Sequence, residues 1–405
     1  MTDQSAGESQ WRSQGTHAAT DVGDRLWVER LTLTNFRNYV SATFQFDQRP
    51  VVLTGPNGAG KTNLMEAVSL LSAGQGLRRA AYPELGRAHG PGGWSVAARL
   101  HTPVGALDVG TGLQPSSANN ARAGRIVRID GESQGGTGIL ADLVEMVWLT
   151  PAMDGLFTGP ASERRRFLDR LILCFDPSYR TRIGHFERAM QNRNRLLADG
   201  VTDRAQLEGF ERVMVETGAA IAAARLEAVG QLTSTIAERR ERAPDSPFPW
   251  ATLQLEGFLE TELAVRAAVD VEEIYARRLA AMRERDRAAA RTLEGPHRSD
   301  LIVGHGPKAM AARLCSTGEQ KALLVGLVLA HAELAHRRRD GSGPILLLDE
   351  IAAHLDRARR SALYDEILRL GLQAWMTGTD LEPFSPLDGK AQFFTVDDAR
   401  LTAIS

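Results

Sequence analysis

Eight consecutive residues have the types and the spacing of a phosphate-binding loop. Residues 55–62 fit the pattern Gly-x-x-x-x-Gly-Lys-[Ser/Thr] without a mismatch. Glycines let backbone N–H groups curl around a phosphate, a lysine at this spacing reaches the β- and γ-phosphates, and the hydroxyl after it ligates Mg²⁺. The residues that would contact a nucleotide are Gly55, Pro56, Asn57, Gly58, Ala59, Gly60, Lys61 and Thr62, followed by Asn63. We therefore expect a site for ATP and Mg²⁺.

The residues on either side of the loop supply the context that it needs. Residues 50–54 predict a short buried strand, and residues 63–71 predict the first turns of a helix. The N-terminus of such a helix adds a partial positive charge at the phosphate. An ordinary glycine turn and a Rossmann dinucleotide loop are the alternatives, and Lys61 followed by Thr62 argues against the second.

Two carboxylates, Asp349 and Glu350, end an apolar strand predicted over residues 345–348. In a nucleotide-binding sheet, the first carboxylate at such a strand end holds Mg²⁺, mostly through water, and the second orients or deprotonates the attacking water. Taken alone, an apolar strand that ends in Asp-Glu is common. Together with Lys61 and Thr62 it predicts an ATPase, with Lys61 and Glu350 as catalytic residues and with Thr62 and Asp349 as metal ligands.

A third candidate stretch, residues 315–321, opens a helix predicted over residues 322–335. It reads Cys-Ser-Thr-Gly-Glu-Gln-Lys, and a serine and a glycine at a helix start present a hydroxyl and backbone N–H groups to an anion. A simple N-cap by Ser316 or Thr317 is the alternative interpretation.

The remaining sequence predicts a mixed α/β chain. Further strands are predicted over residues 27–33, 44–46, 94–100, 124–130, 144–149, 251–255, 374–377 and 392–396, the last being the final strand. Helices are predicted within residues 162–243 and over residues 272–292 and 361–370. The strands within residues 94–130 are typical of an antiparallel meander beside the main sheet.

Two periodic patterns make more detailed predictions. Alternation in residues 27–33 places Trp27, Glu29, Leu31 and Leu33 on one face of a strand. Residues 207–228 carry apolar side chains at three- and four-residue spacing, which favours core packing over an intermolecular coiled coil.

Composition excludes several classes of protein. The chain has 405 residues and a formal net charge of −2, so any contact with nucleic acid must come from local basic patches. The two cysteines have no partner at metal-ligand spacing, which favours buried, reduced thiols. The longest apolar run, residues 322–330, is too short to span a bilayer and predicts a core helix. We expect a cytoplasmic protein without a membrane partner.

Several stretches resemble the RecF family of recombination proteins. Residues 159–169 resemble its Gly-x-Pro-x-x-Arg-Arg-x-Phe-Leu-Asp stretch, and residues 294–301 resemble its Gly-Pro-His-Arg-Asp-Asp-Leu stretch. Residues 35–39 are similar to its Phe-Arg-Asn turn, and residues 74–79 to its Gly-x-Gly-x-x-Arg turn. The resemblance is colinear over most of the chain, and ABC transporter subunits lack the first two stretches.

The resemblance implies an α/β fold: an ABC-type P-loop ATPase head of the SMC kind, with an antiparallel β meander and an inserted helical lobe. Residues 1–24 would be a mobile tail, residues 25–160 and 292–405 the two parts of the ATPase lobe, and residues 161–291 the helical lobe. Such proteins are head-to-tail dimers around two nucleotides.

The resemblance also implies roles for particular residues. Residues 315–321 are similar to the signature loop of ABC ATPases, so Ser316, Gly318 and Gln320 would act across the dimer on the partner's ATP. Arg37 and Asn38 would lie near the nucleotide.

The function that the resemblance implies is ATP-dependent DNA binding in recombinational repair and replication, by a weak, DNA-stimulated ATPase. ATP would drive dimerisation on double-stranded DNA or at junctions of single and double strands, and slow hydrolysis would release the dimer. With RecO and RecR, such a protein helps to load RecA. A nucleotide-binding subunit of an ABC transporter and a non-hydrolysing scaffold are the alternatives.

Two features differ from the general ABC pattern, and the sequence offers only candidates for the residues that would contact DNA. The glutamine of many ABC ATPases has no clear match, with Asp154 the nearest candidate, and residues 377–379 replace a switch histidine, which leaves the γ-phosphate sensor undefined. Arginines within residues 164–166, 188–195 and 337–339 are candidate contacts to DNA phosphates, with internal ion pairs or a solvated helix face as the alternative.

Overall fold

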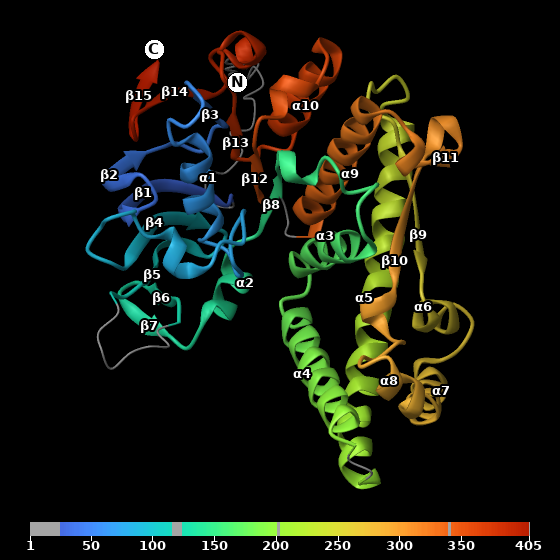
Figure 1. Ribbon diagram of the computed structural model, residues 1–405. Coiled ribbons are helices and arrows are strands. Elements are labelled where there is room, and N and C mark those ends of the chain that lie inside the picture. Colours follow the sequence, from blue (N-terminus) through green and yellow to red (C-terminus); the bar gives the residue numbers. More distant parts are fainter. Residues whose placement is uncertain (1–24, 116–123, 201–202, 339–341, 405) are drawn as a thin grey trace, which may run out of the picture.

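Figure 1 shows a computed structural model of the protein, which describes residues 25–115, 124–200, 203–338 and 342–404. The predicted tail of residues 1–24 lies outside these residues. Two six-stranded sheets form one side of the molecule, and a helical region with a small three-stranded sheet forms the other (Figure 1). None of the helices in the described ranges has the length and apolar content that crossing a membrane requires.

The strands are β1 Trp27–Phe36, β2 Tyr39–Gln45, β3 Val51–Thr54, β4 Trp94–Thr102, β5 Gly105–Leu113, β6 Ile126–Ile129, β7 Glu132–Gln134, β8 Met146–Leu149, β9 Ala251–Glu256, β10 Asp300–His305, β11 Met310–Ala311, β12 Ile345–Leu348, β13 Ala374–Thr377, β14 Gln392–Asp397 and β15 Arg400–Ile404. The α-helices are α1 Lys61–Ser69, α2 Leu140–Leu143, α3 Ala161–Leu173, α4 Tyr179–Ala198, α5 Arg204–Arg242, α6 Phe258–Leu263, α7 Ala268–Ala281, α8 Arg283–Ala288, α9 Thr317–Arg338 and α10 Arg357–Arg369.

The sheet that carries the predicted site has the strand order β15-β14-β3-β13-β12-β8. Strands β14, β3, β13, β12 and β8 run parallel, and β15 pairs antiparallel with β14 at the edge. The prediction that β14 is the final strand is therefore wrong. A turn with positive φ at Asp398 and Ala399 returns the chain to make β15, and neither residue is a glycine that would mark such a turn in the sequence.

The second sheet is antiparallel throughout and has the order β2-β1-β4-β5-β6-β7, which confirms a meander. The predicted face of residues 27–33 is wrong, because a β-bulge between Val28 and Arg30 shifts the alternation. Val28 is therefore buried with Leu31 and Leu33, whereas Trp27 is only half-buried.

Helix α1 lies between the two large sheets. Its Leu64 and Val68 share a buried core with Leu31 of β1 and with Leu347 of β12. The other face of the parallel sheet, represented by Leu346, packs against the core that α9 and the helical region form. Adjacent residues of β12 thus point into two different cores, because side chains alternate along a strand.

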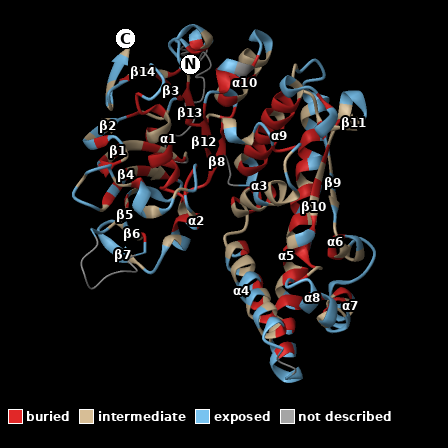
Figure 2. Cartoon of the chain, viewed as in Figure 1, coloured by how far each residue is buried: buried red, intermediate tan, exposed pale blue. Residues whose placement is uncertain are grey.

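The helical region is built around α5, which forms an antiparallel hairpin with α4 (Figure 1). The apolar stripe of residues 207–228 packs within the chain, as predicted, and exposed residues gather toward the tip of the hairpin (Figure 2). The helix predicted over residues 272–292 is instead two helices, α7 and α8, and it ends before Ala290, whose φ is +53°.

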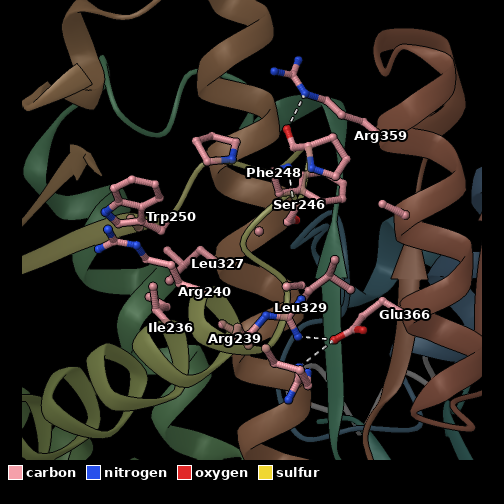
Figure 3. Close-up of a pocket in the computed structure, with 18 of the residues that line it drawn as sticks. Ile236, Arg239, Arg240, Ser246, Phe248, Trp250, Leu327, Leu329, Arg359 and Glu366 are labelled. Carbon is pink, nitrogen blue, oxygen red and sulfur yellow. Dashed lines mark hydrogen bonds and ion pairs between the residues drawn. The ribbon is translucent and has the colours of Figure 1, made fainter. Parts of the chain in front are cut away.

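The C-terminal end of α5 meets α9 and α10 at a cavity of about 640 Å³. Arg239 bonds there to Glu366, and Arg359 donates to the Pro247 carbonyl at 3.2 Å (Figure 3). Arg240 lies over the Trp250 ring, 4.0 Å from its centroid. The contacts of Arg239 and Arg359 join the helical region to α10.

Candidate active site

The predicted phosphate-binding loop connects the end of β3 to the start of α1. Gly55 has φ +135°, and a Cβ there would come within 2.2 Å of the Val396 carbonyl oxygen. Gly60 has φ +115°, and a Cβ there would lie 2.7 Å from the Asn38 side-chain amide. Both positions therefore favour glycine for conformation, and Gly55 also requires it for space, because its neighbour is backbone.

Lys61 begins α1 and is almost fully buried. Its ammonium donates to the carbonyl oxygens of Gly55 at 2.5 Å and Pro56 at 3.0 Å, so it lies across the loop that it follows. Burial lowers the pKa of Lys61, and the nearby carboxylates of Glu350 and Asp349 oppose that shift. The lysine charge and the two predicted carboxylates are therefore close enough to interact.

Asp349 and Thr62 meet at the carboxyl edge of the parallel sheet. Strands β3, β13 and β12 are neighbours, so the residues after their carboxyl ends converge. The Asp349 Oδ1 accepts a hydrogen bond from Thr62 Oγ1 at 3.2 Å and another from Thr377 Oγ1 at 2.7 Å. The structure thus brings together the two predicted metal ligands, which are 287 residues apart in the chain.

Glu350 is exposed and lies next to this pair in a strained backbone conformation. Its φ of +51° and ψ of +30° place a non-glycine residue in the left-handed region. The Glu350 N–H donates to Thr377 Oγ1 at 2.8 Å, so one hydroxyl bonds to both consecutive acidic residues. These bonds of Thr377 were not predicted from the sequence. Thr377 is the last residue of β13, the neighbour of β12, and that position could have indicated a contact with Asp349.

A cavity of about 570 Å³ adjoins this edge. Its lining residues are Thr62, Leu77, Arg78, Arg79, Trp148, Thr150, Pro151, Ala152, Met153, Leu156, Glu163, Arg166, Phe167, Arg170, Asp349 and Glu350. Predicted residues from the loop and from β12 thus share one cavity with α3 and with the segment after β8. The Thr62 hydroxyl and the Asp349 carboxylate fit Mg²⁺, which prefers oxygen ligands and takes others from phosphate and water.

Asn38 contacts the phosphate-binding loop, whereas Arg37 is committed elsewhere. The Asn38 amide donates to the Ala59 carbonyl at 3.3 Å, and its oxygen accepts from Asn63 at 2.8 Å. The Arg37 guanidinium makes two bonds of 2.8 and 2.9 Å to Glu66, a fully buried residue of α1. A nucleotide contact by Arg37 stays a prediction, and it would compete with this ion pair.

The predicted signature residues lie at the start of α9 and do not line the cavity. Glu319 accepts hydrogen bonds from the Ser316 N–H at 3.0 Å and from the Ser316 hydroxyl at 2.9 Å, and the first of these is the bond that a glutamate supplies in a capping box. An ion pair with Lys308, reinforced by Ser316, lowers the pKa of Glu319 to about 2. Ser316 and Gly318 are nevertheless exposed.

Gln320 behaves differently from its neighbours. Its side chain is buried and donates to the Cys315 carbonyl at 2.8 Å. A contact between Gln320 and a second copy stays a prediction that would require this bond to break.

Asp154, the nearest candidate for the missing glutamine, reaches the same helix. It follows β8, and both of its carboxylate oxygens lie 3.2 Å from the ammonium of Lys321 in α9. The segment between the sheet and the cavity is therefore tied directly to the helix that carries the signature residues.

Most arginines of the three basic clusters form internal contacts. Arg164 makes two bonds of 2.8 Å to Asp300, and Arg165 donates to the Ser299 carbonyl at 2.5 Å. Arg193 is fully buried. Arg337 pairs with Glu238 and Glu333, whereas residue 339 lies outside the described residues. The alternative interpretation, internal ion pairs, therefore holds for Arg164, Arg193 and Arg337, whereas Arg165 bonds to a backbone carbonyl.

Comparison with known proteins was made for both sequence and fold. The profile of the family described as RecF/RecN/SMC N terminal domain matches residues 27–377. A protein of Mesorhizobium japonicum named DNA replication and repair protein RecF is 55% identical over 371 residues, which is 91% of this chain and 96% of that protein. A protein of the same name from Brucella suis is 51% identical over 94% of this chain and 97% of its own length.

Two kinds of solved structure share the fold. The recombination mediator protein RecF-ATP in RecFOR pathway matches with a TM-score of 0.79 at 22% identity, over 94% of this chain and 99% of that one. An SMC head bound to the C-winged helix domain of ScpA matches with a TM-score of 0.54 at 15% identity, over 94% of this chain and 98% of that one. The fold is that of an SMC-like ABC ATPase head. The chain belongs to the RecF family.

Proposed function

We propose that the protein is an ATP-dependent DNA-binding ATPase of replication and recombinational repair. The observation that carries the proposal is the hydrogen-bonded set of Thr62, Asp349, Thr377 and Glu350 at one edge of the parallel sheet. The names of the curated relatives, DNA replication and repair protein RecF, support the cellular process.

The side chains at the sheet edge have separate tasks in this proposal. Lys61 leaves the carbonyls of Gly55 and Pro56 for the β- and γ-phosphates of ATP, which exchanges neutral acceptors for charged ones. Thr62 and Asp349 hold Mg²⁺, which neutralises charge on the phosphates when it is bound. Glu350 orients the attacking water and accepts its proton. Asn38 steadies the loop through the Ala59 carbonyl.

The second half of each site comes from a second copy. Ser316 and Gly318 are exposed at the start of α9, and they do not line the cavity of their own chain. A head-to-tail dimer would place their hydroxyl and N–H groups on the γ-phosphate that the partner holds. ATP would then stabilise the closed dimer, and slow, DNA-stimulated hydrolysis would open it.

The DNA partner of the closed dimer would be double-stranded DNA or a junction of single and double strands, where RecO and RecR assist in loading RecA. Binding would rest on phosphate contacts and would weaken with salt.

We also propose the division into an ATPase lobe, residues 25–160 and 292–405, and a helical lobe, residues 161–291. The antiparallel sheet lies within the first range, and α3 to α8 lie within residues 161–291.

Fluorescence anisotropy of labelled duplex DNA tests the proposal, with light scattering for mass. Wild type, Lys61→Met and Glu350→Gln are compared with and without ATP and Mg²⁺ at one fixed salt concentration. We expect ATP to produce a DNA-bound dimer, Glu350→Gln to hold it longer than wild type, and Lys61→Met to form none. DNA binding that is indifferent to ATP in all three proteins would refute the clamp. Equal turnover by Glu350→Gln and wild type would make the chain a non-hydrolysing scaffold.

A further inference from the structure

The cavity beside Glu350 is lined by four arginines from two parts of the chain. Arg78 and Arg79 follow α1, whereas Arg166 and Arg170 lie on α3. Arg78 is engaged, because it donates to Asn63 at 2.9 Å and lies 3.7 Å from Glu66. The other three arginines form no such hydrogen bond to an oxygen atom within the described residues.

Arg170 is the most enclosed of the three. Its guanidinium stacks on the Trp148 ring, 4.6 Å from the centroid, and touches the Met153 sulfur at 3.6 Å. Its Nε is buried and has no hydrogen-bond partner among the described residues. Burial, helped by the charge of Arg79, lowers the pKa of Arg170 to about 10. A cation with aromatic and sulfur neighbours and an unused donor is suited to receive an anion.

Arg79 and Arg166 lie closer to solvent and also lack strong partners. Arg79 has φ +55° and forms no ion pair or hydrogen bond within the described residues. Partial burial and the charge of Arg166 lower the pKa of Arg79. Within the described part of the chain, the ion pair of Arg166 is a long contact of 3.7 Å to Glu163. Its neighbours on α3, Arg164 and Arg165, are held by the chain itself.

These three cations repel one another across a shared cavity, and an oxyanion between them would remove that cost. Guanidinium groups bind phosphate oxygens through paired N–H donors, so a tetrahedral oxyanion matches this set. Three carboxylates also line the cavity, those of Glu163, Asp349 and Glu350. Glu163 lies 3.7 Å from Arg166, and its charge partly opposes the lowering of the Arg79 pKa, so it supplies one negative charge to three cations.

We propose that Arg79, Arg166 and Arg170 form a site for inorganic phosphate, the product that leaves after ATP hydrolysis. The inference rests on the proposed function. Thr62 and Glu350, where the γ-phosphate would be cleaved, line the same cavity as the arginines. In the head-to-tail dimer, a second copy would cover the outer side of the nucleotide. Arg79 and Arg166 are exposed and belong to the same chain as Thr62 and Glu350, so phosphate held by them would have a path to solvent.

Titration calorimetry of inorganic phosphate into the full chain with ADP and Mg²⁺ tests the site. The variants are Arg166→Gln and Arg79→Gln, both at exposed positions that leave the cores intact. Arg212→Gln, an exposed arginine of α5 outside the cavity, is the matched control. We expect each cavity variant to weaken phosphate binding by about ten-fold, the effect of losing one charge-assisted hydrogen bond. ADP affinity and the affinity of the control for phosphate stay unchanged.

Other outcomes would overturn the inference in distinguishable ways. If wild type binds ADP but no phosphate, or if the variants bind phosphate like wild type, the arginines do not form this site. A loss of ATP affinity without a loss of phosphate affinity, measured in a Glu350→Gln background, would assign them to the bound γ-phosphate. A loss confined to duplex DNA binding would assign them to DNA. Failure of wild type to bind ADP would instead refute the proposed function.

Discussion

The sheet edge around Asp349 and the helical region around Arg193 hold charged side chains in opposite ways. Asp349 is fixed by two neutral hydroxyls, those of Thr62 and Thr377, and among the described residues its charge has no bonded counter-ion. Arg193 is fully buried and bonds to two carboxylates, Glu211 at 3.0 Å and Asp286 at 2.7 Å. Charge is left available where chemistry is proposed, and it is cancelled where the chain only has to stay folded.

Other charged side chains of the protein show the same difference between paired and unpaired charge. Arg225 bonds to Asp169 at 2.9 Å in the helical region, and the buried Glu333 accepts bonds from several arginines where α5 meets α9 and α10. The proposed phosphate site repeats the pattern of the sheet edge with the sign reversed, because Arg79 and Arg166 have little counter-charge. Uncompensated charge therefore distinguishes candidate sites from scaffold in this protein.

Removing Arg193 from its ion pairs has the largest expected effect on stability. Arg193→Met leaves Glu211 and Asp286 buried with less counter-charge, so we expect a loss of about 3–5 kcal/mol in the free energy of unfolding. Denaturant unfolding followed by tryptophan fluorescence measures it. Arg195→Met, an exposed position on the same helix, is the control, with a loss below about 0.5 kcal/mol. Equal, small losses in both variants would mean that the pairing in the helical region is not what stabilises it.

His331 is a buried titratable side chain of α9, where that helix packs against the helical region, and pH can test its role. Its Nε2 lies 2.9 Å from the Leu171 carbonyl, and its ring is tilted against Phe175 with the centroids 4.8 Å apart. Burial, with the charge of Arg170, lowers the pKa of His331 to about 4. The neutral form is favoured in the folded state, so its contribution is complete above the unfolded pKa near 6.5 and is lost as pH falls toward 4.

We expect that loss to reach about 3 kcal/mol, from the two pKa values. Unfolding free energies measured between pH 7 and about pH 4 check it. His331→Gln flattens this part of the profile, whereas the exposed His185→Gln does not. A profile that His331→Gln leaves unchanged would contradict the assignment.

The prediction with the smallest expected effect concerns Thr377 at the sheet edge. Thr377→Val keeps the shape of the side chain but removes the hydroxyl shared by Asp349 and the Glu350 N–H, so we expect about ten-fold slower ATP turnover with little change in ATP affinity. Steady-state turnover and equilibrium nucleotide binding separate the two quantities. Thr377→Ser should restore the rate, and Thr379→Val, on the exposed loop after β13, should not alter it. Unchanged turnover in Thr377→Val would show that the hydroxyl only supports the fold.

The accuracy of the sequence predictions depended on whether the signal was local. Strands β12 and β13 were predicted with their correct bounds, because a strand buried on both faces is a continuous apolar run. Strand β5 was missed, since its glycines and mixed pattern give no clear alternation. The face of β1 was wrong because a bulge, which depends on pairing with β4, cannot be read from one strand alone.

The sequence by itself determined the chemistry of the phosphate-binding loop, because its glycines, Lys61 and Thr62 act through contiguous backbone and need only one strand and one helix. It also determined family membership, through motifs whose order along the chain survives without a structure. Only the tertiary structure decided that Thr377 bonds to both acidic residues, that Arg37 pairs with Glu66, and that Arg79 and Arg166 line one cavity. Those contacts join segments far apart in sequence, and they form only when parallel strands align their carboxyl ends and α3 packs beside them.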